Sequence, residues 1–282
     1  MVELTEPRNV GPDHRRRTPT PMTDKMIARK DGPIGTLIFN NPERHNAVSF
    51  EMWEAVGTIL DGFRADPAIR VVILTGAGGK AFVSGADISK FGDERATMDA
   101  QNRYNATTER IYATVQAFPK PTIAMIRGYC IGGGLGLAIA CDLRFCTEAS
   151  KFALPAAKLG IGYGYAGIER FVQTIGPSQT KDIFFSARQL DAAEALRIGL
   201  VNRVIGDAEL ETETTAYAST IAGNAPLTIA AAKLIATELM KPEATRDIAR
   251  CKTAVDACFA SADFIEGRTA FLEKRKAKFR GE

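Results

Sequence analysis

The chain has 282 residues, enough for one large core or for a main domain with a smaller appendage. Hydrophobic residues make up 45% and charged residues 24%, a composition typical of folded globular proteins. The formal net charge of +3, with basic and acidic residues interleaved, argues against a nucleic-acid partner. Five cysteines without a CxxC pair indicate reduced thiols and a cytoplasmic location, and only two histidines exclude a histidine-rich metal site. No apolar stretch reaches membrane-spanning length, so no membrane partner is expected.

The N-terminal stretch is polar, rich in proline and contains the run Arg15-Arg16-Arg17. It has no apolar segment and therefore does not form a signal peptide. We expect residues 1–24 to be a disordered extension, with Met22 as a candidate natural start. A targeting or binding arm is the alternative interpretation.

Predicted strands and helices alternate from residue 25 to about residue 205. Ser49 can cap a helix whose apolar residues recur at helical spacing. The apolar, β-rich runs predict strands over residues 34–40, 69–76, 121–128 and 142–148, and the helical pattern predicts a further helix over residues 98–118.

Beyond residue 205 the pattern changes to helices alone. Three helical stretches follow one another, "PLTIAAAKLIATELM", "RDIARCKTAVDACF" and "DFIEGRTAFLEKRKAKF". The order of elements therefore predicts an α/β core over residues 25–205 and an all-α C-terminal region over residues 206–282.

Two glycine-rich loops each follow a predicted buried strand. They are "FVSGADI" (82–88) and "GYCIGGGLGLAIACDL" (128–143). A strand that turns through glycines into a helix directs backbone N–H groups and the positive end of the helix at one spot, which suits an anion or a developing oxyanion. Close packing between strand and helix also demands glycine, so either loop alone is ambiguous. The presence of two such loops favours a functional site.

One glycine pattern does not indicate a nucleotide site. "GYGYAG" (162–167) fits GxGxxG literally, but it lacks a clean preceding strand and the acidic residue about 20 places later that a dinucleotide site needs. No GxxxxGK[ST] sequence occurs, so a P-loop is also excluded.

Several motifs together carry a family resemblance. "AFVSGADI", "KPTIAMIRGYCIGGGLGLAIACDLRF", "ARQLDAAEALRIGLVNRVI" and "FLEKRKAKF" resemble the enoyl-CoA hydratase/isomerase (crotonase) superfamily from about residue 25 to the C-terminus. The resemblance implies a spiral of ββα turns, a C-terminal helical region used in trimerisation, and a homotrimer or dimer of trimers. It also implies an acyl-CoA thioester substrate, with coenzyme A as part of the substrate and no tightly bound cofactor.

The resemblance also implies site residues. In the family, two backbone N–H groups hold the thioester oxygen, and by position these fall on Ser84 and Gly133. The implied coenzyme A pocket comprises Arg44, Ala86, Asp87 and Ile88, with Phe271 and Lys274 from a neighbouring subunit. Four of these residues have structural alternatives. Arg44 could be a solvated turn residue and Asp87 a helix N-cap, and Phe271 and Lys274 could belong to an ordinary helix face.

Two acid/base groups of the family's hydratases are absent. One glutamate position is Gly136 and the other, after Pro155, is Ala156. Hydration needs a base and an acid, whereas loss of CO₂ from an α-carboxyacyl-CoA needs only an oxyanion site. The vacated position 136 predicts either room for a bulky acyl group or a site without proton chemistry.

The favoured reaction is therefore of decarboxylase type. Tyr163 in "KLGIGYGYAGIERF" is the candidate that holds the departing carboxylate, and this region is similar to the methylmalonyl-CoA decarboxylase branch. The alternatives are a hydratase or isomerase with a relocated base such as Glu169, and a non-catalytic acyl-CoA-binding protein. Glu94 and Glu109 are further candidate carboxylates, and Asp142 is expected to be structural.

Overall fold

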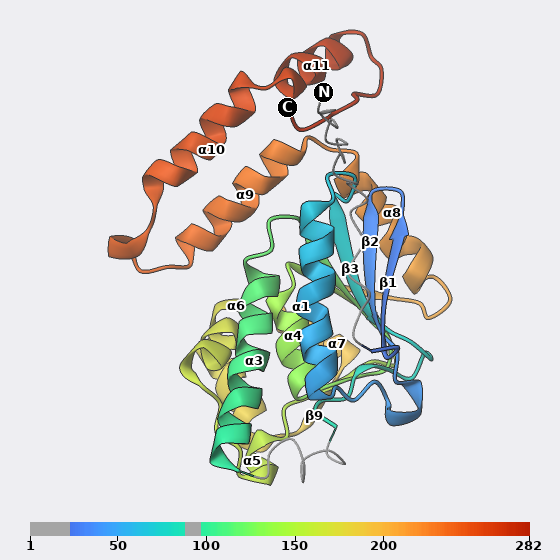
Figure 1. Ribbon diagram of the computed structural model, residues 1–282, viewed down its shortest axis with the longest axis vertical. Helices are drawn as coiled ribbons and strands as arrows, with labels where there is room; N and C mark the ends of the chain where they lie inside the picture. Colours follow the sequence, from blue (N-terminus) through green and yellow to red (C-terminus); the bar gives the residue numbers. More distant parts are fainter. Residues whose placement is uncertain (1–22, 88–96) are drawn as a thin grey trace, which may run out of the picture.

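The structure, a computed structural model, describes residues 23–87 and 97–282 (Figure 1). Most of the predicted N-terminal extension, together with Ile88 and Glu94, lies outside these ranges. Among the described residues, none of the helices combines the length and apolarity that a bilayer crossing requires.

A six-stranded sheet forms one side of the core, in the order β1-β2-β3-β5-β7-β10. The first pair is antiparallel and the remaining neighbours are parallel. Its strands are β1 (Met26–Asp31), β2 (Ile34–Phe39), β3 (Val71–Gly76), β5 (Thr122–Ile126), β7 (Leu143–Thr147) and β10 (Arg203–Ile205). The strands in the middle of this sheet are apolar and buried, as expected of parallel strands covered on both faces.

A second sheet, made of very short strands, positions the two glycine-rich loops. Its order is β4-β6-β8-β9, with the first three strands parallel and the last antiparallel. The strands are β4 (Ala81–Val83), β6 (Tyr129–Ile131), β8 (Lys151–Ala153) and β9 (Gln189–Asp191). Because β4 and β6 are parallel neighbours, the two glycine loops that follow them emerge at the same edge of the sheet.

Helices pack around both sheets. Those of the core are α1 (Phe50–Ala65), α3 (Met98–Gln116), α4 (Gly133–Ala140), α5 (Ala156–Leu159), α6 (Tyr165–Ser186) and α7 (Ala192–Arg197). The predicted cap of α1 is confirmed, since the Ser49 side chain accepts a hydrogen bond from the Met52 amide. Asp142 is structural as expected: its carboxylate accepts hydrogen bonds from the Thr122 amide and hydroxyl, and it pairs with Lys233.

The C-terminal region is helical, as predicted, and part of it projects from the core. It contains α8 (Leu210–Ala222), α9 (Pro226–Leu239), α10 (Ile248–Ala260) and α11 (Ala262–Leu272). Helix α8, which the sequence pattern did not predict, buries Leu210 and Ala218 against the large sheet. Helices α9, α10 and α11 form an arm that extends away from the two sheets (Figure 1).

The last predicted helix ends earlier than expected. It stops at Leu272, and Lys274 adopts a left-handed backbone with φ of 54°. The remaining tail turns back along α11, where the Asp263 carboxylate accepts hydrogen bonds from the Arg280 and Gly281 amides. Arg70 of the core also donates to the carbonyl of Phe279, which fastens this tail to the sheet side of the molecule.

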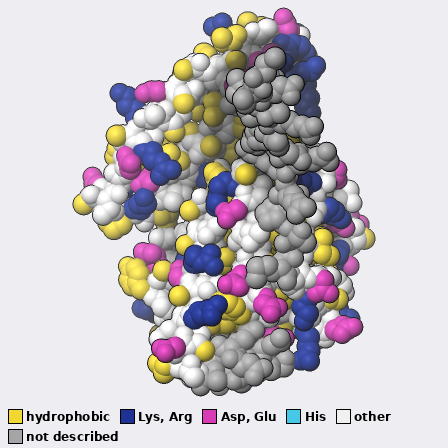
Figure 2. All heavy atoms as spheres, in the orientation of Figure 1, with side chains coloured by type: hydrophobic (Ala, Val, Ile, Leu, Met, Phe, Trp, Pro, Cys, Tyr) yellow, Lys and Arg dark blue, Asp and Glu magenta, His cyan; other side chains and the backbone are white. Residues whose placement is uncertain are grey.

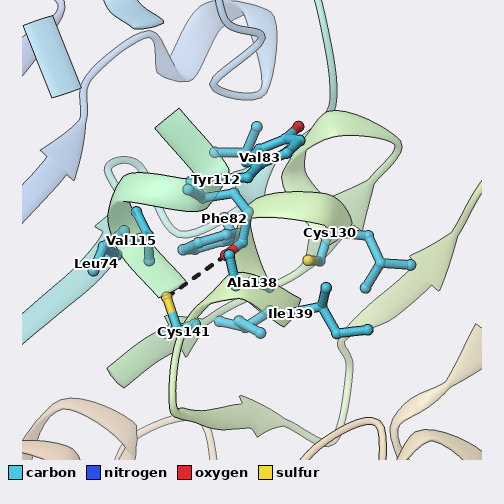
Figure 3. Close-up of a cluster of buried hydrophobic side chains, with 14 of the residues drawn as sticks. Leu74, Phe82, Val83, Tyr112, Val115, Cys130, Ala138, Ile139 and Cys141 are labelled. Carbon is cyan, nitrogen blue, oxygen red and sulfur yellow. Dashed lines mark hydrogen bonds between the residues drawn. The ribbon is translucent and has the colours of Figure 1, made fainter. Parts of the chain in front are cut away.

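The five cysteines divide between the core and the arm. Cys130, Cys141 and Cys146 are buried, and burial raises the pKa of the latter two thiols to about 12. Figure 3 shows Cys130 and Cys141 among the apolar side chains that surround α4. Cys251 and Cys258 lie on α10 and are partly exposed.

Candidate active site

The two glycine turns are in contact. Gly85 and Gly132 both have left-handed backbones, with φ of 109° and 55°. A Cβ atom built on Gly132 would lie 3.9 Å from the Cα of Gly85, and one built on Gly85 would lie 4.0 Å from the nitrogen of Gly133. The positive φ favours glycine at both positions, and the distances place the two turns in van der Waals contact.

Gly133 supplies one free backbone donor at this contact. It is the first residue of α4, so its N–H has no acceptor within the helix. The neighbouring turn is fixed, because the Gly132 amide donates to the Ala153 carbonyl at 2.9 Å. The Gly133 amide is therefore held at the positive end of a helix, where negative charge is stabilised.

The structure corrects the second predicted donor. The Ser84 amide already donates to the His45 carbonyl at 3.1 Å, so it cannot also serve an oxyanion. Two residues later, Ala86 forms an isolated parallel bridge with Val48. The Gly85 carbonyl and the Asp87 amide both bond to Val48, so the Ala86 N–H points away from that strand partner. Ala86 replaces Ser84 as the candidate donor.

The space beside Gly136 is filled, which corrects the expectation of room for an acyl group. A Cβ atom at position 136 would lie 3.1 Å from both the Cζ and hydroxyl oxygen of Tyr112. The Tyr112 hydroxyl donates to the Gly133 carbonyl at 2.8 Å, and its ring packs edge-on against Trp53. Figure 3 shows Tyr112 beside Val83 in the buried cluster. Burial raises the pKa of this phenol well above its usual value.

The second glutamate position of the hydratases, Ala156, also carries no acidic group nearby in its own helix. Ala156 begins α5 and is buried in the apolar core. The carboxylate that the structure brings toward Tyr112 is Glu109, which binds both terminal nitrogens of Arg170 at 2.8 and 2.7 Å. The Arg170 guanidinium is buried and lies 5.4 Å from the centroid of the Tyr112 ring. Glu169 is a neighbour of Arg170 on α6 and is half-buried.

Tyr163 lies near the same cluster. Its ring packs edge-on against Phe184, with centroids 5.1 Å apart, and contacts the main core. Its phenol is close enough to contribute to the raised pKa of Tyr112. The structure thus brings Tyr163 and Tyr112 together from the loop before α6 and from α3, two segments far apart in the sequence.

The predicted coenzyme A residues fall into two groups. Arg44 is exposed at the end of a 3-10 turn, η1 (Pro42–Arg44), and its carbonyl accepts a hydrogen bond from the Ser84 hydroxyl. It therefore lies beside the glycine loop, together with Ala86 and the buried Asp87. Phe271 and Lys274 belong to the arm, whose helix α11 lies at the opposite end of the molecule from α5 (Figure 1). They do not reach the site of their own chain.

Sequence reasoning missed Tyr112, Trp53 and Arg170. Each lies on a long helix, where an aromatic or a basic residue at helical spacing is ordinary. The one signal that could have found Tyr112 was the unusual glycine at position 136, because a glycine in a helix interior can mark a position where a neighbour packs closely.

Residues 29–282 match the sequence profile of the enoyl-CoA hydratase/isomerase family. The chain belongs to this family. A crotonyl-CoA hydratase of Syntrophomonas wolfei is 35% identical over 256 residues, which cover 91% of this chain and 98% of the relative. A carnitinyl-CoA dehydratase of Escherichia coli is 35% identical over 267 residues, covering 92% and 100%.

Solved structures agree with this assignment. The crystal structure of an enoyl-CoA hydratase/carnithine racemase from Magnetospirillum magneticum has a TM-score of 0.86 at 35% identity, and the match covers 92% of this chain and 97% of that one. The predicted family and the crotonase-like α/β fold are therefore confirmed, and an acyl-CoA thioester is the substrate class consistent with them.

Proposed function

We propose that this enzyme stabilises the enolate of an acyl-CoA thioester between the Ala86 and Gly133 amides, and that it removes CO₂ from an α-carboxyacyl-CoA. The observation that carries the proposal is the pairing of Gly136 with Tyr112. A neutral phenol occupies the space where a hydratase of this family would present a carboxylate.

Decarboxylation suits a site with donors and without a base. The electron pair of the C–C bond flows into the thioester as CO₂ departs, and the two amides take up the charge that develops on oxygen. A carboxylate beside the α-carbon would repel the substrate carboxylate, whereas a phenol does not. Tyr163 is the proposed hydrogen-bond donor that holds the departing carboxylate out of the thioester plane.

The coenzyme A portion is proposed to extend past Ala86 and Asp87 toward Arg44. The guanidinium of Arg44 is exposed, so it is accessible to a phosphate group of the ligand. Phe271 and Lys274 would complete the pocket from a neighbouring subunit of a homotrimer or dimer of trimers. The exposed apolar side chains of the arm support such an assembly, and Figure 2 shows hydrophobic atoms over this part of the surface.

A second candidate function is hydration or isomerisation with a relocated base. It is favoured by the names of the relatives, a crotonyl-CoA hydratase and a carnitinyl-CoA dehydratase. In this alternative Glu109 is a better candidate base than Glu169, because Glu109 faces the cluster around Tyr112. It would first have to be released from Arg170.

A panel of acyl-CoA esters followed by mass spectrometry separates the two reactions. Methylmalonyl-CoA and ethylmalonyl-CoA should lose CO₂, and crotonyl-CoA should remain unchanged. Addition of water to crotonyl-CoA without CO₂ loss from any malonyl-type ester would replace the first proposal by the second. Binding of these esters without any turnover would leave only an acyl-CoA-binding role.

A further inference from the structure

The hydroxyl oxygen of Tyr112 lies close to the points where side chains would begin at Gly136 and Gly133. It is 3.1 Å from a Cβ atom built on Gly136 and 3.2 Å from one built on Gly133. It also donates to the Gly133 carbonyl at 2.8 Å. The phenol therefore reaches the first turn of α4 from α3 and sits next to the amide that is proposed to hold the thioester oxygen.

The surroundings leave this hydroxyl ready to donate. Trp53 packs against the ring, but its indole N–H donates to the Tyr104 hydroxyl at 2.9 Å and not to Tyr112. The apolar environment raises the pKa of Tyr112, which keeps the phenol protonated at neutral pH. A hydroxyl can rotate from the Gly133 carbonyl toward a new acceptor without movement of the ring.

The guanidinium of Arg170 can stabilise the phenolate that forms when Tyr112 donates its proton. The Arg170 guanidinium is 5.4 Å from the ring centroid and lowers the pKa of Tyr112. Burial, Tyr163, Tyr104 and Glu109 raise it, so the resting phenol stays protonated. The phenol can thus lose a proton during turnover and regain it afterwards.

We propose that Tyr112 is the proton donor that quenches the enolate, and that Gly136 is a glycine because this phenol takes the place of a side chain there. The role rests on the proposed decarboxylation. The C–C bond to the carboxylate breaks, its electron pair forms the enolate, and CO₂ leaves. The α-carbon then takes the proton of the Tyr112 hydroxyl, and the phenolate recovers a proton from water. Each turnover consumes one proton from solvent.

The test uses Tyr112→Phe, with Tyr104→Phe as the matched control. Both variants remove one buried tyrosine hydroxyl from α3, but the Tyr104 hydroxyl bonds to Trp53 and not to Gly133. Ethylmalonyl-CoA is turned over in D₂O, and the butyryl-CoA product is oxidised by a dehydrogenase that removes one α-hydrogen stereospecifically. Mass spectrometry of the resulting enoyl-CoA then reports the configuration of the α-deuterium.

The wild-type enzyme and Tyr104→Phe should place deuterium in a single configuration. Tyr112→Phe should slow the net formation of butyryl-CoA at least tenfold, because the enolate must wait for a proton from water and a general acid typically contributes 10²–10⁴-fold, and it should give both configurations. A structural defect alone would slow the reaction without scrambling the product.

Three results would overturn the role. They are a single configuration from Tyr112→Phe, scrambling by Tyr104→Phe to the same degree, and wild-type protein that releases no CO₂ from any malonyl-type ester. The third also removes the proposed reaction, whereas the first two leave it intact. If Tyr112→Phe does not fold, a fluorinated tyrosine at position 112 keeps the shape and lowers the phenol pKa, and product formation should then change with that acidity.

Discussion

Two glycines inside helices have opposite surroundings. Gly136 faces the buried Tyr112 ring at 3.1 Å, whereas a Cβ atom on Gly62 in α1 would meet nothing within 4 Å. We expect Gly136→Ala to destabilise the fold by about 1–3 kcal/mol, because the confined ring cannot move aside. Gly62→Ala should instead stabilise it by up to about 1 kcal/mol. Urea unfolding measures both, and equal gains in stability would show that Tyr112 does not pack on α4.

The amide of Gly133 can be removed while the helix is kept. Proline is tolerated at the first position of a helix, where the N–H has no partner within the helix. We expect Gly133→Pro to lower kcat by about 10²–10³-fold, as expected for the loss of one oxyanion donor. Gly133→Ala is the control, because it adds a Cβ atom but retains the N–H. Equal losses in the two variants would mean that crowding, not the missing amide, causes the effect.

At the level of single residues, the sequence predicted the backbone donors better than the side chains around them. Gly133 follows from its place in the glycine loop. The second donor was assigned to Ser84, whose amide is occupied, because its bond to the His45 carbonyl depends on a left-handed residue in a distant turn. The contact between Tyr112 and Gly136 joins two helices and leaves no local pattern.

At the scale of elements, one ion pair fastens α6 to α3. Arg170 is buried and binds Glu109 through both terminal nitrogens, while Glu109 itself is 44% exposed. We expect Glu109→Gln to destabilise the fold by about 1–3 kcal/mol, because it leaves a buried guanidinium without its counter-charge. The exposed pair between Arg29 and Glu211 provides the control. Glu211→Gln should change the free energy of unfolding by less than about 1 kcal/mol, and similar values for both would contradict this account.

The long elements were predictable and the short ones were not. Residues 98–118 were expected to be helical, and α3 spans Met98–Gln116. The strands of the smaller sheet have only three residues each, too few for an alternation to be recognised. The pairing of these strands determines the geometry of the candidate site, because it brings the loops after β4 and β6 together. The sequence thus indicated the two loops, while their meeting depends on long-range pairing.

At the scale of the whole molecule, the attachment of the C-terminal tail depends on pH. The Arg275 side chain and then the Lys278 amide lower the pKa of Glu266 from 4.5 to about 2. A carboxyl group with a depressed pKa in the folded state contributes stability above pH 4.5, and that contribution is lost as the pH falls toward 2. We therefore expect the tail to loosen in this range.

Pepsin, which is active in this range, can measure the loosening. Cleavage near Phe271 and Leu272 should accelerate as the pH falls from 4.5 toward 2. Glu266→Gln should already be cleaved rapidly at pH 4.5, because it removes one of the two carboxylates that pair with Arg275. A variant that is cleaved as slowly as the wild-type protein at pH 4.5 would show that this pair does not hold the tail.

Because the partly exposed thiols lie in the arm and the buried thiols in the core, the native cysteines can report the accessibility of the arm. A maleimide applied to the folded protein should modify Cys251 and Cys258 on α10 and spare the three buried cysteines. The rate at which these two thiols are modified then measures how accessible α10 is, without an engineered label. If subunits associate through α10, dilution that separates them should speed the reaction, so the same two sulfur atoms would report assembly in real time.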